Sequence, residues 1–89
     1  MAEIDKIIEE LQKILKKYCK YENINKNTII FDKKNRLLDS LEIMNFICEI
    51  EKKFVIEDLI YEDITLDNFK TVYTLAKFIL KLKEKEKNE

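Results

Sequence analysis

Apolar residues recur every three or four positions in three stretches of the chain, which is the period of an amphipathic helix. The first stretch covers residues 1–20, and the second runs from Ser40 to about Phe54 with a wider apolar face. The third runs from about Phe69 or Thr71 to Leu82. The inward positions are Ile4, Ile7, Ile8, Leu11, Ile14, Leu15 and Tyr18, then Leu41, Ile43, Met44, Phe46, Ile47, Cys48, Ile50 and Phe54, and finally Phe69, Val72, Tyr73, Ala76, Ile79 and Leu80.

The connecting segments lack this period. Residues 21–38 hold four asparagines, three before and one after the apolar cluster Ile29-Ile30-Phe31. We therefore expect a long loop that Ile30 or Phe31 pins to the core. Residues 62–65 are expected to form a short helical turn, and Asp67-Asn68 to cap the helix that follows. The chain closes on alternating lysines and glutamates, and we expect residues 81–89 to be a frayed, charged tail.

Together these elements predict an all-α domain over residues 1–89. The expected architecture is a small antiparallel four-helix bundle, with three main helices, one short helix and a long first loop. We expect Cys19 and Cys48 to be buried free thiols in a reducing compartment, because both fall within apolar helical patterns. No apolar run is long enough to cross a membrane, and the pattern favours a cytoplasmic monomer that binds no membrane.

The composition and the charge distribution limit the classes of function that the chain is expected to have. The chain has no histidine, so the usual neutral-pH base and the commonest metal ligand are missing. This argues against an ordinary Ser-His or Cys-His enzyme, and an enzyme would need carboxylate or lysine chemistry instead. We expect no catalytic residues and no metal site. Net charge is −1, yet residues 39–69 carry nine acids against two lysines, a balance of −7. This segregation predicts basic protein partners on that segment and disfavours nucleic acid, which the same charge repels.

The run Leu37-Leu38-Asp39-Ser40-Leu41-Glu42 is typical of a helix start. Asp39 can accept hydrogen bonds from free backbone N–H groups, and Glu42 can reach back to close a capping box. Ser40 then lies on the first turn, near solvent and the positive end of the helix dipole, where a phosphate ester is favoured. The motif alone suits either a plain helix cap or a modified serine.

With its neighbours, this motif resembles the acyl carrier proteins over nearly the whole chain. The resemblance rests on residues 38–41, on Glu49 to Phe54, on Val55-Ile56-Glu57, on residues 62–65, and on Asp67-Asn68-Phe69 with Val72. The sequence departs from the family in three places. Leu37 stands where the family often has glycine, Asn45 stands where fatty-acid carriers commonly have an acid, and Lys52-Lys53 interrupts the acidic run.

The resemblance implies that Ser40 carries 4′-phosphopantetheine, transferred from coenzyme A by a phosphopantetheinyl transferase, with Asp39 as the adjacent cap. The thiol of that arm would hold acyl or aminoacyl groups as thioesters for fatty-acid or specialised acyl biosynthesis, so the protein itself would not be an enzyme. Loading ligases or synthases with basic patches would be its partners. The implied docking residues are Glu42, Glu49 and Glu51, and the implied acyl-pocket residues are Met44 and Ile47. The alternative is an unmodified helical adaptor with an acidic docking face.

Overall fold

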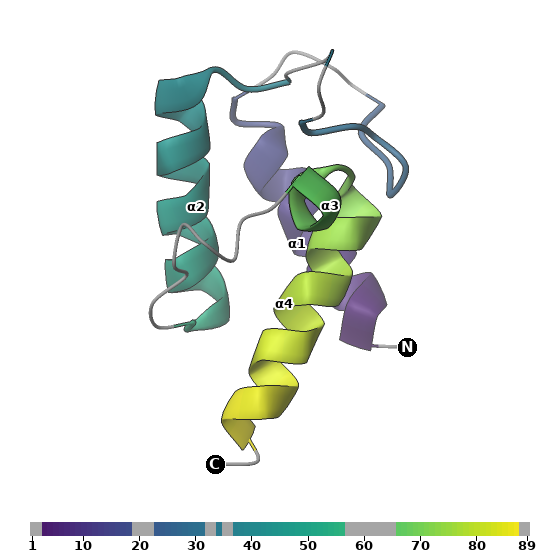
Figure 1. The fold of residues 1–89 in the computed structure, drawn as a ribbon, viewed down its shortest axis with the longest axis vertical. Coiled ribbons are helices and arrows are strands. Elements are labelled where there is room, and N and C mark those ends of the chain that lie inside the picture. The colour runs from purple at the N-terminus through teal and green to yellow at the C-terminus, as the bar shows by residue number, and fades with distance from the viewer. Residues whose placement is uncertain (1–2, 19–22, 32–33, 35–36, 57–65, 88–89) are drawn as a thin grey trace.

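The computed structural model describes residues 3–18, 23–31, 34, 37–56 and 66–87. Within these residues the chain forms α1 (Glu3–Leu15), α2 (Ser40–Phe54), α3 (Leu66–Phe69) and α4 (Val72–Lys87), and it contains no β-strand (Figure 1). Three helices have 13 to 16 residues, whereas α3 is a single turn of four. The all-α prediction is therefore confirmed for the described residues.

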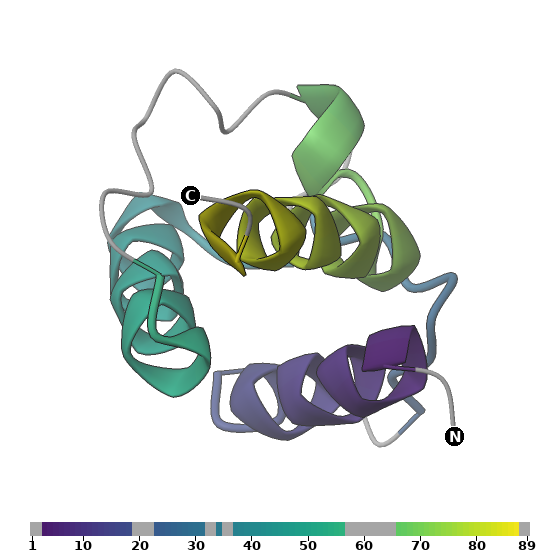
Figure 2. The same cartoon turned by 90° about the horizontal axis from the view of Figure 1, so that it is seen from below.

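Helix α1 runs antiparallel to both α2 and α4. The Lys17 and Glu49 side chains meet where α1 ends beside the middle of α2, and the Lys83 and Glu3 side chains lie 4.0 Å apart where α4 passes the start of α1. Helices α2 and α4 consequently run in the same direction, because each is antiparallel to α1 (Figure 1). Figure 2 shows α1, α2 and α4 arranged around a common centre.

The core lies between these three helices, and Phe46 of α2 is at its centre. Phe46 is fully buried and makes T-shaped ring contacts with Tyr18 on one side and Phe69 on the other, at centroid distances of 6.5 and 5.9 Å. The buried residues are Ile7, Ile8, Leu11, Ile14, Leu15, Ile24, Ile30, Leu38, Phe46, Ile47, Ile50, Phe54, Ile56, Phe69, Val72, Leu75, Ala76 and Ile79. Among the described helices, none is both long and apolar enough to cross a membrane.

The apolar stripe predicted for the first helix is confirmed, but the predicted end of that helix at about Lys20 is wrong. Helix α1 ends at Leu15, and the next turn tightens, with the Lys17 N–H donating to Ile14 O and the Tyr18 N–H donating to Leu15 O. This tighter turn carries the Tyr18 ring onto Phe46. The end of α1 therefore coincides with the point at which Tyr18 packs against the core.

Helix α2 begins and ends as predicted, and its last turn is closed by a left-handed residue. Val55 has φ 52° and ψ 49°, and the N–H groups of Val55 and Ile56 both donate to Glu51 O. The reversal turns the chain back so that Ile56 enters the core, while the Val55 side chain is left 77% exposed. A β-branched residue is costly in this conformation, because its side chain crowds the backbone.

Ile30 pins the long first loop to the core, as predicted, and the structure adds backbone hydrogen bonds between this loop and the start of α4. Ile30 is fully buried, and its N–H donates to Lys70 O at 2.7 Å. In return, the Val72 N–H donates to Thr28 O, and an isolated antiparallel bridge joins Ile29 to Thr71. The loop carbonyls thus accept hydrogen bonds from backbone N–H groups that have no partner within the helix.

Helix α4 begins within one residue of the predicted start at Thr71, but its cap and its end differ from the prediction, and the tail expected to fray from residue 81 is helical up to Lys87. Thr71 caps it through reciprocal bonds with Thr74, whereas Asp67-Asn68, the predicted cap, lies within α3. The helix also continues past Leu82 to Lys87, because lysine and glutamate are good helix formers. Tyr73 is 40% exposed rather than inward, and Leu75 is buried instead. The short turn predicted at residues 62–65 lies outside the described residues.

Candidate functional site

The start of α2 has the predicted capping box. Asp39 is extended (φ −77°, ψ 177°), and its Oδ1 accepts a 2.8 Å hydrogen bond from the Glu42 N–H. The Glu42 carboxylate accepts a 3.0 Å hydrogen bond from the Asp39 N–H in return. Leu38, just before the box, is buried in the core and fixes the direction in which the chain enters the helix. The first turn is therefore held by groups other than Ser40.

Ser40 is the first residue of α2 and is exposed. Because Asp39 and Glu42 supply both side chains of the capping box, the Ser40 hydroxyl takes no part in it. The side chain sits at the positive end of the helix dipole, where free N–H groups favour an anion. This position combines an accessible hydroxyl with a field that stabilises a phosphate ester.

Three residues that follow Ser40 form what we call the outer face of α2: Leu41, Met44 and Cys48. Their spacing of three and four places them on one side of the helix. Leu41 is 72% exposed, Met44 is 44% exposed, and the Cys48 thiol is exposed and free. Helix α2 stands at one edge of the molecule in both views (Figures 1 and 2).

The prediction that Cys48 is buried is therefore wrong. Only one side of α2 faces the core, and it is filled by Phe46, Ile47, Ile50 and Phe54. Cys48 falls on the opposite side, because it is two residues from both Phe46 and Ile50 and a helix turns about 100° per residue. Cys19, the other predicted buried thiol, lies outside the described residues.

The two residues predicted to line an acyl pocket lie in different environments. Ile47 is 7% exposed and belongs to the core, whereas Met44 is on the outer face. Neither side chain lines the surface hollow described below. The described residues thus give Ile47 a packing role.

The three predicted docking acids do not share one side of α2. Glu42 and Glu49 are seven residues apart and lie on the flank that faces α1, whereas Glu51, two residues beyond Glu49, lies on the other flank beside Met44. Glu42 takes part in the capping box, and Glu49 contacts α1. The structure therefore places only Glu51 next to the outer face.

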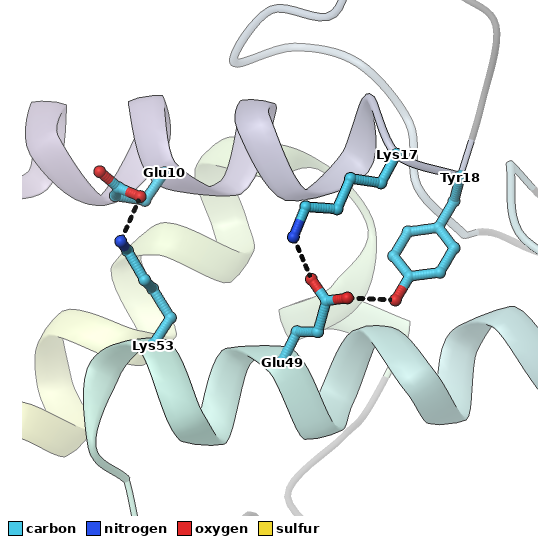
Figure 3. A network of polar contacts seen from close by, with 5 residues as sticks. All are labelled: Glu10, Lys17, Tyr18, Glu49 and Lys53. Atoms are coloured by element: carbon cyan, nitrogen blue, oxygen red, sulfur yellow. Dashed lines mark hydrogen bonds and ion pairs between the residues drawn. The ribbon is translucent and has the colours of Figure 1, made fainter.

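Glu49 belongs to a network of polar contacts that joins α1 to α2 (Figure 3). The Tyr18 hydroxyl donates a 2.7 Å hydrogen bond to Glu49 Oε1, and Lys17 Nζ lies 3.3 Å from Glu49 Oε2. Farther along the two helices, Lys53 Nζ lies 3.2 Å from Glu10 Oε2. We call these contacts the α1–α2 seam.

The seam shifts the ionisation of three of its members. The hydrogen bond from Tyr18 lowers the pKa of Glu49, and the hydrogen bond from Lys53 lowers the pKa of Glu10. Burial, followed by the hydrogen bond to Glu49, raises the pKa of Tyr18 to about 12. Both carboxylates are thus held in the charged form, and Tyr18 is held in the neutral form that can donate.

A hollow of about 510 Å³ lies along the seam. Four lysines and two glutamates line it together with one apolar residue; these are Lys13, Lys17, Lys52, Lys53, Glu10, Glu49 and Ile14. The sequence pattern singled out Lys52-Lys53 only as an interruption of the acidic run. Their convergence with Lys13 and Lys17 depends on how α1 packs against α2, and the periodicity of neither helix predicts it.

Within the described residues, no group of three or more His, Cys, Asp or Glu side chains is placed to hold a metal ion. Comparisons of the chain with protein-family models, with curated proteins and with solved structures found no match in any of the three.

Proposed function

We propose that this chain is a carrier protein that holds acyl or aminoacyl groups as thioesters on 4′-phosphopantetheine attached to Ser40. The observation that carries the proposal is the position of Ser40, which is exposed at the first residue of α2 beside a capping box that does not use its hydroxyl. A transferase can therefore modify the hydroxyl without removing a contact that holds the helix. Ser40 is also the only serine in the sequence.

The resemblance to the acyl carrier proteins supplies the identity of the modification, and the architecture it implies remains part of the proposal. On this view α3 is the short member of a four-helix bundle, and the protein acts in the cytoplasm. The protein's own contribution is to present the arm and to be recognised, because the reactive bond belongs to the cofactor.

The surface proposed for partner enzymes is the outer face of α2 together with Glu51. It begins beside Ser40 and offers exposed apolar side chains at Leu41 and Met44. An apolar patch with a charged neighbour suits a transient protein contact, in which the charge acts mainly on the rate of encounter. Glu49 is the weakest of the three docking candidates, because Tyr18 and Lys17 already engage its carboxylate.

The test is intact-protein mass spectrometry after incubation with coenzyme A and a broad-specificity phosphopantetheinyl transferase. We expect one phosphopantetheine adduct on the wild type and none on Ser40→Ala. Asn27→Ala changes an exposed neutral residue in the first loop, away from α2, and should be modified normally. Absence of an adduct on the wild type, while a known carrier is modified in the same tube, would contradict the proposal and favour the unmodified adaptor.

A second set of variants, measured in the same modification assay, tests whether the transferase recognises the outer face of α2 together with Glu51. Glu51→Lys should slow modification, most strongly at low salt, where charges are least screened. Glu9→Lys makes the same charge change at an exposed position on α1 and should leave the rate close to that of the wild type. Equal slowing in both variants would show that net charge, rather than this face, governs recognition.

A further inference from the structure

The hollow along the α1–α2 seam has the size and the chemistry of a small binding site. Its volume of about 510 Å³ falls within the range of small-molecule sites. Ile14, only 5% exposed, contributes apolar surface to the lining, and the methylene stems of the lysines extend it. The lining thus combines apolar surface with cationic side chains.

The charges that line the hollow do not balance. Four lysines face two glutamates, so the lining carries a net charge of +2. The cross-helix contacts of the seam use one lysine for each carboxylate, Lys53 for Glu10 and Lys17 for Glu49. Two of the four lysines therefore make the cross-helix ion pairs of the seam, and the other two make no cross-helix ion pair among the described contacts.

Those additional lysines are Lys13 and Lys52, one from each helix. The Lys13 ammonium lies 3.7 Å from Glu10, but its side chain is 72% exposed, so this pair contributes little to stability. Lys52 is exposed and acts on Glu49 only through its charge. Placement near a helix C-terminus favours lysines through the helix dipole, yet the dipole does not require lysines of two helices to border the same hollow.

We propose that this hollow binds a small phosphate monoester, with the phosphate at Lys13 and Lys52 and an apolar body against Ile14 and the lysine stems. A phosphate dianion matches the net charge of the lining, and lysine is a common phosphate ligand. Glu10 and Glu49 also line the hollow, and their ion pairs with Lys53 and Lys17 offset the charge that they would present to the added anion. The site lies toward the opposite end of α2 from Ser40 and does not depend on modification of that residue.

The test follows backbone amide shifts by NMR in the unmodified protein at constant ionic strength. Two probes are titrated separately, inorganic phosphate and phenyl phosphate. We expect saturable shifts at residues 13–17 and 49–53. Phenyl phosphate should bind about fivefold more tightly than inorganic phosphate, because its ring buries apolar surface.

Two matched double variants test whether the phosphate binds at Lys13 and Lys52 or responds only to the net charge of the protein. Lys13→Gln with Lys52→Gln should weaken phenyl phosphate binding about tenfold through the loss of two ammonium contacts. Lys6→Gln with Lys81→Gln removes the same charge from exposed positions outside the hollow and should change the affinity less than about twofold. All four side chains are exposed, and thermal melts of both double variants check that each remains folded.

Three results would overturn the proposal. Shifts centred on residues 40–42 would place the anion at the start of α2 instead. Equal weakening in the two double variants would mean that only net charge matters, and equal affinity for the two probes would remove the apolar part of the site. Cosedimentation with phosphatidylglycerol vesicles, without shifts from phenyl phosphate, would instead identify a membrane-contacting surface.

Discussion

The Tyr18 hydroxyl donates a 2.7 Å hydrogen bond to Glu49 Oε1, and this contact joins the end of α1 to the middle of α2. The same Tyr18 ring packs edge-on against Phe46 at the centre of the core. One side chain therefore links the polar seam to the apolar interior. Ionisation of either partner should be measurable as a change in the stability of the whole fold.

At high pH, the stability of the protein should fall as Tyr18 loses its proton. Its folded pKa is raised to about 12 from an ordinary value of 10.0, so its contribution is complete below pH 10 and is lost as the pH rises toward 12. Tyrosinate absorbance should show a late step in the wild type that Tyr18→Phe removes. Tyr73→Phe is the control and should retain the late step.

At low pH, the seam should weaken as Glu49 becomes protonated. Its folded pKa is lowered from 4.5, so its contribution is complete above that value and is lost as the pH falls through the folded pKa. In Tyr18→Phe the main cause of the shift is gone, and the pKa of Glu49 should move up toward 4.5. A carboxyl carbon titration by NMR measures this, and an unchanged Glu49 pKa in the variant would contradict the assigned cause.

Asp39→Ala should lower the free energy of unfolding by about 1 kcal/mol, because Asp39 accepts the hydrogen bond from the Glu42 N–H. Ser40→Ala should stay within about 0.5 kcal/mol of the wild type, since its hydroxyl is outside the capping box. Urea denaturation followed by circular dichroism compares the two. A larger loss in Ser40→Ala than in Asp39→Ala would mean that the serine, not the aspartate, holds the helix start.

Val55→Gly should raise the free energy of unfolding by about 0.5–1 kcal/mol, the balance of relieved left-handed strain and added freedom in the unfolded chain. Because the Val55 side chain is exposed, its removal should cost little packing energy. Val55→Ala, which keeps the strain of a Cβ atom, should gain less. A destabilised Val55→Gly protein would show that the valine side chain contributes more than its exposure indicates.

The Cys48 thiol should react with a thiol reagent in the folded protein at a rate comparable to that in the unfolded chain, because it is free and exposed. Cys19→Ser leaves Cys48 as the only thiol and makes the measurement specific. The unfolded rate is obtained in denaturant with the same variant. Slow reaction that becomes fast only on unfolding would show that Cys48 is protected after all.

Local signals predicted the start and the length of α2. The Asp39–Glu42 capping box is encoded within four residues, and the apolar period continues without interruption to Phe54. The sequence also predicted the burial of Ile30, because an apolar cluster inside a polar segment is expected to pack against the core. These features depend on residues that are close together in the sequence, and a local pattern can therefore predict them.

The features that the sequence predicted wrongly, or did not predict, depend on residues far apart in the chain. The wide apolar face of α2 could not indicate which side would be covered, so Cys48 was expected in the core. The early end of α1 coincides with the contacts of Tyr18 with Phe46 and Glu49, which no local pattern contains. The lysine-lined hollow likewise exists only because α1 and α2 pack antiparallel.

The hydrogen bonds between the first loop and the start of α4 constrain the order in which the protein can fold. The Val72 and Tyr73 N–H groups donate to carbonyls of Thr28 and Lys26, which belong to the other half of the chain. Neither the loop nor the α4 terminus can acquire its native backbone pairing until the two halves of the chain have come together, so this pairing is a long-range event. The amide protons of Ile30 and Val72 should therefore exchange with solvent together, and only when the whole domain opens.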